Sequence, residues 1–444
     1  MTNYPNPDSN SAQLFQRACK VLPGGNSRST IFYAPYPIFA RSGQGCRITD
    51  VDGVERVDFV NNYTVLIHGH AHPEISKAVA AQLELGAGFA HPTEAELLLA
   101  ELLTSRVPSF ERIRFVNSGS EAVMNAVKAA RAYTERPMIA KCEGVYHGSY
   151  DYVEVSLDSS AANWGEDTPL SVPYARGTPP KVLEDVAVIP FNDVERSERI
   201  LTTHASELAA VVIDVMPNRA GLIPATPEYL TMLREVTRRH GIVLILDEVI
   251  SLRLGYQGGQ TEFGIQPDLT TMGKVIGGGL PVGAVAGKAE VMEMFNHSRG
   301  KAPLPHAGTF NGNPLTMAAG HAAMQLMTEE AFARLNALGE RARSQLHEAI
   351  KVAGVEGRIT GKGSLFMIHL KDKPLTTYRD SFKSPEEQQL LASVHRHFLN
   401  NGIIIAAGGL GALSTPMTEV EIDQLSEVFL GALRALPQPA AVPA

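Results

Sequence analysis

Short apolar runs alternate with amphipathic helical patterns through the middle of the chain. This alternation is typical of βαβ units, in which helices cover a mostly parallel sheet. Two of the runs, at 209–215 and 242–246, are continuously apolar, as expected for strands that are buried on both faces. The pattern predicts six strands, at Ile113–Val116, Met138–Lys141, Val186–Ile189, Ala209–Val215, Ile242–Leu246 and Gly283–Gly287.

The two ends of the chain follow a different pattern. Within residues 47–60, Asp52-Gly53 separates two alternating runs, which predicts a hairpin. From about residue 328 onward the sequence predicts a separate block of helices and strands. This block contains helices at Glu329–Val352 and Pro385–Asn400, strands at Ser364–Leu370 and Gly402–Ala406, and a last helix that begins at Thr418 with a capping box to Glu421.

We therefore expect a fold of the α/β class with two domains. A large domain over residues 56–327 would hold the mostly parallel sheet and its flanking helices. The smaller α+β domain would span residues 328–444 and would be joined by the N-terminal segment, residues 1–55. The length of 444 residues fits this division, because one domain typically contains about 100–200 residues.

Composition and charge narrow the choice of partners. The chain has 39 basic and 47 acidic residues, which gives a net charge of −8 with neutral histidines. It therefore lacks a global positive field for nucleic acid or an anionic membrane, so an anionic ligand must be bound locally. Three cysteines are too few for a disulfide framework, which favours a reducing compartment. With no signal-peptide pattern and no segment apolar enough to span a bilayer, we expect a cytoplasmic protein.

The segment FVNSGSEA at 115–122 runs from a predicted strand into a predicted helix. Ser118 and Glu121 have the spacing of a capping box, and Gly119 allows a ligand to approach the backbone closely. The N–H groups of a helix N-terminus, together with the hydroxyls of Ser118 and Ser120, suit a phosphate ester. The alternative is an ordinary capped helix, since capping boxes are common.

Two more candidates lie further along the chain. Asp247 stands at the carboxyl end of the predicted strand 242–246, the edge at which open α/β sheets bind ligands. A buried acid needs a partner, either a protonated ring nitrogen or a loop amide. Lys274 lies between an apolar segment and the glycine run 277–279. A shielded amine can have a lowered pKa and attack a carbonyl to form a Schiff base; the alternative is a solvated surface lysine.

An anion cradle, a strand-end acid and a shielded lysine together fit pyridoxal phosphate. The acid would keep the pyridine nitrogen protonated, and the lysine would carry the aldehyde. Tyr146, just after the predicted strand 138–141, could stack on the ring or simply pack within its loop. The signatures of dinucleotide-binding, P-loop, zincin and α/β-hydrolase proteins are absent from the sequence.

With these features in place, the chain resembles the class III aminotransferases of the fold-type I pyridoxal phosphate enzymes. The resemblance covers roughly residues 20–435. It is strongest in the glutamate-1-semialdehyde aminomutase branch and in its neighbours, the β-amino-acid (β-phenylalanine-type) aminotransferases. The motifs that carry it are GHAHPE at 69–74, NSGSEA at 117–122, YHG at 146–148, LDEV at 246–249, GKVIGGGLPVGA at 273–284 and GTFNGNP at 308–314.

The resemblance implies a role for each candidate. Lys274 would be the Schiff-base lysine and proton shuttle, and Asp247 would pair with the pyridinium nitrogen. The segment Ser118–Ser120 would hold the phosphate, and Tyr146 would stack on the ring. Asn218 falls where the family often bonds the phenolic oxygen of the cofactor.

Family members build each active site at a dimer interface, so the resemblance also implies a homodimer. Thr309 of the GTF motif would reach the phosphate of the neighbouring subunit, or would alternatively cap its own loop. The chain departs from the family after the strand at 209–215, where most members carry a Glu-Pro pair. The glutamate position corresponds here to Val215 or, with a shift of one residue, to Asp214.

A second departure concerns the substrate. Arg28 matches the arginine that binds the substrate carboxylate in the β-amino-acid branch, a task that suits the two-pronged guanidinium. The branch supplies another arginine in a segment matching 406–413, where this chain has glycines. A carboxylate would then be held by Arg28 alone, or the pocket is open to a bulkier or uncharged group. Tyr63 and the loop 251–258 would form other walls, and the alternative for Arg28 is a surface ion pair.

The histidines His68, His70 and His72 could suggest a metal site. No carboxylate or thiolate cluster accompanies them, and the resemblance places them in the turn that follows the hairpin, so we expect no metal. The leading hypothesis is a ping-pong aminotransferase that acts on a β-amino acid or related amine and a 2-oxo acid. The alternatives are an intramolecular 2,1-aminomutase and a non-catalytic cofactor-binding protein.

Overall fold

The computed structural model describes residues 4–437, and the chain divides into two units. The first unit combines the chain up to His72, Arg334–Lys373 and the chain from Lys383 onward. The second unit comprises Pro73–Ala333 and Pro374–Phe382. The N-terminal part of the first unit thus extends to residue 72, where the sequence predicts an end at 55. The sequence also gives no sign that residues 374–382 return to the second unit.

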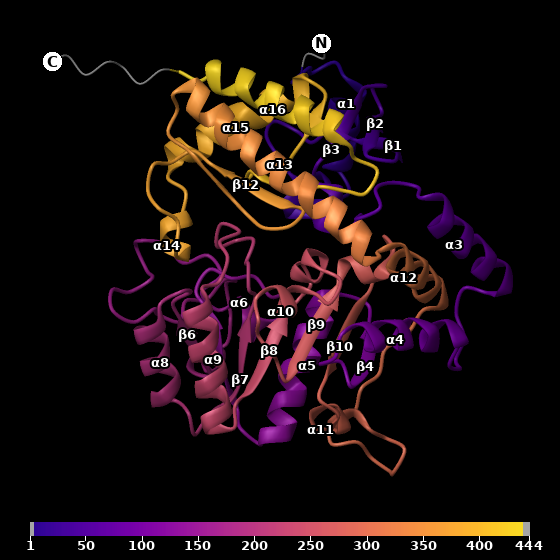
Figure 1. The fold of residues 1–444 in the computed structure, drawn as a ribbon, viewed down its shortest axis with the longest axis vertical. Coiled ribbons are helices and arrows are strands. Elements are labelled where there is room, and N and C mark those ends of the chain that lie inside the picture. The colour runs from indigo at the N-terminus through magenta and orange to yellow at the C-terminus, as the bar shows by residue number, and fades with distance from the viewer. Residues whose placement is uncertain (1–3, 438–444) are drawn as a thin grey trace. The chain divides into compact units, whose positions relative to one another are not determined.

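The second unit is built on a seven-stranded sheet (Figure 1). Its strand order is β4-β10-β9-β8-β7-β5-β6, in which β10 runs antiparallel to both neighbours and the other strands are parallel. The carboxyl ends of the parallel strands therefore meet at one edge. The strands are β4 (Arg112–Val116), β5 (Met138–Cys142), β6 (Val186–Ile189), β7 (Leu208–Ile213), β8 (Val243–Asp247), β9 (Leu269–Gly273) and β10 (Gly283–Gly287).

All six predicted strands are present, within two residues at each end. The sequence does not predict β9, because two threonines and a glycine interrupt its apolar pattern. Its place between β8 and β10 is filled by pairing with both, and no local signal reports such pairing.

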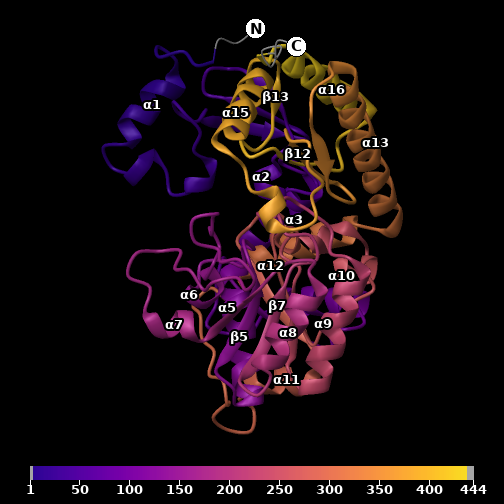
Figure 2. The same ribbon diagram turned by 90° about the vertical axis from the view of Figure 1, so that its left-hand side faces the viewer.

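Successive residues of the strands face two separate cores. In β8, Val243 and Ile245 pack in the core that contains α5 (Gly119–Thr134). Leu244 and Leu246 pack in the core that contains α8 (Val194–Thr203) and α9 (Pro227–His240). Figure 2 shows α5 and α9 on opposite sides of the sheet. Since strand side chains alternate between faces, a strand buried on both sides is apolar at every position.

Local sequence signals set the ends of α9. Thr226 caps the helix by accepting the N–H of Tyr229, and Pro227 occupies the first helical position. Gly241 follows with a φ of 62°, a left-handed conformation that favours glycine. The remaining helices of the second unit are α3 (Pro73–Leu85), α4 (Glu94–Arg106), α6 (Asp151–Glu154), α7 (Pro180–Glu184), α10 (Gly259–Glu262), α11 (Ala289–Met292), α12 (Pro314–Leu326) and α14 (Tyr378–Ser381).

The first unit contains two small sheets and several helices. The predicted hairpin at Asp52-Gly53 is confirmed as the antiparallel pair β2–β3, and the predicted capping box joins Thr418 to Glu421. One sheet has the order β1 (Ala40–Gln44), β2 (Arg47–Asp50), β3 (Glu55–Asp58) and β13 (Ile403–Ile404); the other has β11 (Arg358–Thr360), β12 (Leu365–His369) and β14 (Leu410–Ala412). The helices are α1 (Asn10–Ala18), α2 (Asn61–Thr64), α13 (Glu329–Ala353, most of which lies in this unit), α15 (Pro385–Asn400) and α16 (Glu419–Arg434). Within residues 4–437, no helix is long and apolar enough to cross a bilayer.

Candidate functional site

Two carboxylates emerge on the same face of the sheet, at the carboxyl ends of neighbouring strands. Asp247 ends β8, and strand alternation directs it to the face where Val243 and Ile245 pack near α5. Asp214 directly follows β7 and has the parity of Ala210 and Val212, which pack in the same core. Both acids are buried. The N-terminus of α5 is the beginning of the helix that covers this face.

The N-terminus of α5 is capped as the sequence predicts, with one difference. The Ser118 hydroxyl accepts the N–H of Glu121 at 3.1 Å. The Glu121 carboxylate accepts the N–H of Asn117 at 2.7 Å, one residue before the cap that a capping box would serve. Among residues 4–437, no group accepts from the N–H groups of Gly119 and Ser120. These donors, at the positive end of a 16-residue helix, form an anion cradle.

Glycines bring two neighbouring segments into direct contact with this cradle. A Cβ added at Gly283 of β10 would lie 2.0 Å from the Ser118 carbonyl oxygen, and one added at Gly148 would lie 2.6 Å from the Ser120 Cα. The N–H of Ser149 donates to the Ser120 hydroxyl at 3.0 Å. The loop that carries Tyr146 therefore packs against the first turn of α5.

The same loop places a histidine on Asp247. The Nδ1 of His147 lies 2.8 Å from the Asp247 Oδ2, and Asp247 Oδ1 accepts the Thr271 hydroxyl and the Val249 N–H, each at 3.1 Å. Burial lowers the pKa of His147, and its hydrogen bond to the Asp247 carboxylate opposes this effect. The neutral imidazole donates its Nδ1–H to the Asp247 carboxylate, which has further acceptor capacity. His147 Nε2 is buried without a hydrogen-bond partner among the described residues.

Asp214 is a second acid with different properties. Burial raises the pKa of Asp214 to about 8; the Asp247 carboxylate adds to this effect and the Lys274 ammonium opposes it. Asp214 is therefore mostly protonated at neutral pH, whereas Asp247 is held by three donors. Asp214 is the acid that directly follows β7, while Val215 is fully buried among apolar residues. The sequence allows either Val215 or Asp214 to occupy the position of the family's glutamate. In the structure, Asp214 is the one that interacts with Asp247.

Lys274 directly follows β9, the strand beside β8. Its φ of 50° lies in the left-handed region, which is strained for a residue with a side chain and is often found at functional sites. Gly273 precedes it, and a Cβ there would lie 3.6 Å from the backbone of Gly119. Lys274 is half-buried and is close enough to influence the pKa of Asp214. The lysine, the acid pair and the anion cradle thus occupy one edge of the sheet.

The other predicted site residues of the second unit are placed as follows. Tyr146 is 47% exposed and adjoins His147, so its ring can face a ligand at the cradle. Asn218 is half-buried in the turn after β7, where its carbonyl accepts the N–H of Gly221. Thr309 is exposed in the loop before α12, and no described residue bonds to its side chain. Arg28 and Tyr63 lie in the first unit and contact each other there, with the Arg28 guanidinium 5.6 Å from the ring centroid.

Two of the three neighbouring histidines, His68 and His70, have hydrogen-bond partners in the protein, whereas the buried Nδ1 of His72 has none among the described residues. His70 Nε2 lies 2.8 Å from Asp58 Oδ2, and His68 Nδ1 lies 3.2 Å from the Thr415 hydroxyl. Within the described part of the chain, no group of three or more His, Cys, Asp or Glu side chains is arranged to hold a metal ion.

Sequence reasoning missed three residues of the site. From the sequence, His147 is only part of the YHG motif, Thr271 lies outside the predicted strands, and Asp214 is the alternative to Val215. A signal was available for Thr271: it has the same parity as Leu269, so strand alternation directs it to the Asp247 face. Nothing local predicts the pairing of His147 with Asp247, which lies 100 residues away.

These residues fit pyridoxal phosphate by the chemistry of their donors. The open N–H groups of α5 suit the phosphate, the Asp247 carboxylate suits a protonated ring nitrogen, and Lys274 has the amine that the aldehyde would need. Together with the mostly parallel, helix-covered sheet of the second unit and the smaller first unit, the site defines a fold-type I pyridoxal phosphate enzyme.

Comparison with known proteins agrees with this class. The chain belongs to the class-III aminotransferase family, whose model matches residues 32–433. A glutamate-1-semialdehyde 2,1-aminomutase from Desulforudis audaxviator is 39% identical over 434 residues, which cover 96% of this chain and 97% of the relative. The chain is thus a pyridoxal phosphate-dependent enzyme of the aminotransferase type, which counts against the non-catalytic alternative.

Solved structures give closer matches. The crystal structure of an omega-transaminase from Sphaerobacter thermophilus has a TM-score of 0.95 and 54% identity, covering 97% of this chain and 98% of that one. A transaminase with pyridoxal phosphate bound has a TM-score of 0.89 and 46% identity, covering 95% and 96%. A β-phenylalanine aminotransferase from Variovorax paradoxus has a TM-score of 0.86 and 35% identity, covering 96% and 94%.

Proposed function

We propose that this enzyme transfers an amino group from a β-amino acid or a related amine to a 2-oxo acid by a ping-pong mechanism. The observation that carries this choice is the setting of Arg28, described below. Its similarity to an omega-transaminase and to a β-phenylalanine aminotransferase supports the same substrate class.

The residues of the second unit would divide the chemistry among them. Pyridoxal phosphate, when bound, supplies an electron sink for charge that develops on the amine-bearing carbon. The N–H groups of Gly119 and Ser120 would hold its phosphate, and Asp247 would hold a proton on the ring nitrogen. Lys274 would bind the aldehyde and, once displaced by the donor amine, would move a proton through Nζ. His147 and Thr271 would keep the Asp247 carboxylate oriented.

The neighbours of Arg28 restrain its guanidinium but leave donors available for an anion. Its Nη1 donates to the Asn62 side chain at 2.6 Å, and its guanidinium lies beside the Tyr63 ring. Among the described residues, Arg28 forms no ion pair with a carboxylate, which argues against the ordinary surface pair. A guanidinium restrained by an amide and an aromatic face keeps donors available for a substrate carboxylate.

The backbone around Tyr63 is strained, which also supports a binding role. All four residues of α2, Asn61–Thr64, have positive φ between 48° and 73°. A left-handed turn of this kind costs about 1–2 kcal/mol per residue. It is held by Asp58, whose carboxylate accepts the N–H of Asn61, and by the Asn61 amide, which donates to the Ala412 carbonyl at 2.7 Å. Strain fixed in this way is typical of functional loops.

The segment 406–413 lacks the second arginine of the β-amino-acid branch. Here the chain makes a tight turn, in which Gly409 has a φ of 93° and donates its N–H to the Ala406 carbonyl. We therefore propose that Arg28 alone binds the carboxylate, and that the glycine turn leaves room for a bulky donor side chain.

A donor screen tests the proposed substrate class. We expect transamination of β-amino acids with an equimolar consumption of a 2-oxo acid. In the variant Arg28→Met, KM for a β-amino acid should rise about 10- to 100-fold, because a charge-assisted hydrogen bond contributes about 1.5–3 kcal/mol. KM for an arylalkylamine without a carboxylate should stay constant, as should both values in the control Arg17→Met. Equal losses for both donors would refute the role of Arg28.

The intramolecular aminomutase is the second candidate, favoured by the names of several relatives that are 35–39% identical. The two candidates differ in stoichiometry. Conversion of glutamate-1-semialdehyde without net consumption of a separate 2-oxo acid would support the aminomutase.

We also propose that the enzyme works as a homodimer with shared sites. The exposed Thr309 adjoins Phe310, which is 66% exposed, and α3 and α4 present further apolar side chains such as Leu85 and Leu97. A groove of about 750 Å³ lies between α3, α4 and α12. Monomers normally expose few contiguous apolar side chains, so this surface suits a second copy of the chain. Sedimentation of a fully active monomer would contradict the proposal.

A further inference from the structure

A buried carboxylate lies at the exit of β5, where the chain turns toward the cofactor site. Glu143 directly follows the last residue of β5 and precedes Tyr146 by three residues. Its side chain is 2% exposed. It accepts the Ser159 hydroxyl at 3.2 Å, but one neutral hydroxyl does not offset the cost of burying a charge. Glu143 therefore depends on a cationic partner.

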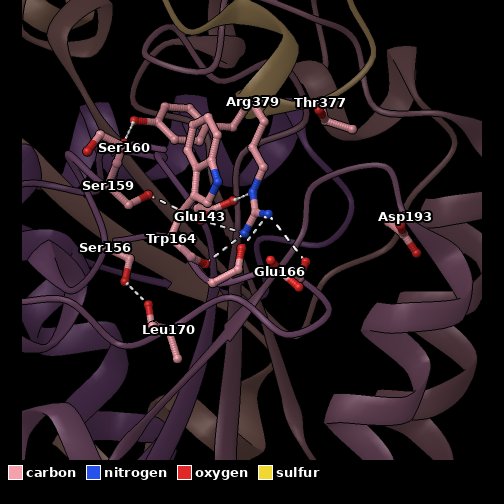
Figure 3. A network of polar contacts seen from close by, with 12 residues as sticks. Glu143, Ser156, Ser159, Ser160, Trp164, Glu166, Leu170, Asp193, Thr377 and Arg379 are labelled. Atoms are coloured by element: carbon pink, nitrogen blue, oxygen red, sulfur yellow. Dashed lines mark hydrogen bonds and ion pairs between the residues drawn. The ribbon is translucent and has the colours of Figure 1, made fainter. Parts of the chain in front are cut away.

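That partner is Arg379, which comes from a distant part of the chain (Figure 3). Its Nε donates to Glu143 Oε2 at 2.8 Å, and its Nη2 donates to Oε1 at 3.1 Å. The remaining N–H groups donate to the carbonyls of Trp164 and Gly165, both at 2.8 Å, and of Glu166 at 3.4 Å, and the guanidinium lies 4.9 Å from the Trp164 ring centroid. This two-pronged arrangement uses the planar fork of arginine, which lysine cannot reproduce.

The short helix α14 that carries Arg379 is docked on the residue after Glu143. Gly144 has a φ of 71°, and a Cβ there would lie 2.0 Å from the Tyr378 ring. The Tyr378 hydroxyl donates to the Ser159 carbonyl at 2.6 Å. A capping box between Thr377 and Asp380 fixes the helix itself. The segment 374–382 thus packs against the two residues that follow β5: Arg379 pairs with Glu143, and the Tyr378 ring occupies the space left by the missing side chain of Gly144.

Among the contacts that hold the loop that follows, two involve buried carboxylates, one near each end. Its start is held by Arg379 at Glu143, and its far end is held by Asp247 at His147. Tyr146 lies between these anchors, and it is the half-exposed residue that could contact a bound ring. Without the Arg379 pair, the start of the loop would keep its backbone hydrogen bonds to Ile189 and Ser156 and the packing of Gly144 on Tyr378, but the Glu143 side chain would no longer be fixed, so the path to Tyr146 would be less precise.

We propose that Arg379 is a positioning residue for the cofactor: through Glu143 it fixes the loop that places Tyr146 against the ring. This inference rests on the proposed stacking role of Tyr146. It assigns a function in the active site to the segment 374–382, which the sequence motifs of the family do not include.

The test uses the full-length protein and pyridoxal phosphate as the probe. The variant Arg379→Met should raise the dissociation constant of pyridoxal phosphate about tenfold or more, as is typical when a residue that orients a ligand contact is lost. The visible circular dichroism of bound cofactor should change, because the ring loses its fixed aromatic neighbour. Arg379→Lys should give a smaller change of the same sign. If Arg379→Met does not fold, the neutral pair Glu143→Gln with Arg379→Met provides the same comparison.

The control is Arg234→Met. Arg234 donates to Asp268 at 3.0 Å in a similarly buried pair, but Asp268 precedes β9 at the opposite edge of the sheet. This variant should lower the thermal stability of the cofactor-free protein without changing cofactor affinity or circular dichroism. If Arg379→Met behaves in the same way, its role is only structural and the inference is overturned.

The variant Tyr146→Ala separates this inference from the assumption behind it. If Tyr146→Ala leaves cofactor affinity and circular dichroism unchanged, the stacking role fails and the inference fails with it. If Tyr146→Ala weakens binding and Arg379→Met adds nothing to it in the double variant, Arg379 acts through Tyr146 as proposed. Full additivity of the two effects would refute that route.

Discussion

The protonated Asp214 beside Asp247 leads to a sharp prediction about stability and pH. Burial raises the pKa of Asp214 from 3.8 to about 8 in the folded, cofactor-free protein. Below pH 3.8 the acid is protonated in both the folded and the unfolded chain. Between 3.8 and about 8 the unfolded chain loses this proton while the folded protein keeps it. The contribution of Asp214 to the free energy of unfolding therefore falls as pH rises through this range.

The magnitude follows from the size of the shift. Each pH unit within the window costs about 1.4 kcal/mol, so the loss between pH 5 and pH 8 amounts to about 4 kcal/mol. The variant Asp214→Asn has no such titration, and its amide oxygen can still accept the Met216 N–H that Asp214 accepts at 2.8 Å. The difference in unfolding free energy between Asp214→Asn and the wild type should therefore grow by about 4 kcal/mol from pH 5 to pH 8.

Denaturant unfolding of the cofactor-free protein at several pH values measures this difference directly. The slope against denaturant should be the same for both proteins, so that the midpoints report stability alone. A difference between the two proteins that stays constant from pH 5 to pH 8 would show that Asp214 is ionised in the folded state, and would refute the reasoning.

Two further predictions concern the cradle and the acid. Gly283→Ala places a methyl group 2.0 Å from the Ser118 carbonyl oxygen, so it should weaken cofactor binding and lower stability by about 1–3 kcal/mol, measured by cofactor titration and thermal unfolding. Gly88→Ala, where a Cβ meets no atom within 4 Å, is its control and should change neither quantity. Thr271→Val removes the hydroxyl that donates to Asp247 and should weaken cofactor binding about fivefold, for a loss of about 1 kcal/mol; unchanged affinity would contradict the orienting role.

Much of the fold follows from local patterns. The continuous apolar runs predict β7 and β8 because strands covered on both faces must be apolar at every position. The capping signals predict the beginnings of α5 and α16 because a helix start needs acceptors for its first N–H groups. The sequence does not predict β9 because polar and apolar residues are mixed in it. Its position depends on hydrogen bonds with the neighbouring strands β8 and β10.

The candidate site shows the same division. The residue types and their linear order can be read from the sequence: an anion cradle at Ser118–Ser120, an acid at Asp247 and a lysine at Lys274. Which of these groups meet depends on the folded chain. In the folded chain, His147 lies against Asp247, and Asp214 rather than Val215 interacts with Asp247. Arg379 binds Glu143, which lies 236 residues earlier in the sequence. Such pairs depend on strand register and on long-range packing, and both come from the whole buried core, whereas capping and periodicity are set by neighbours within a few residues.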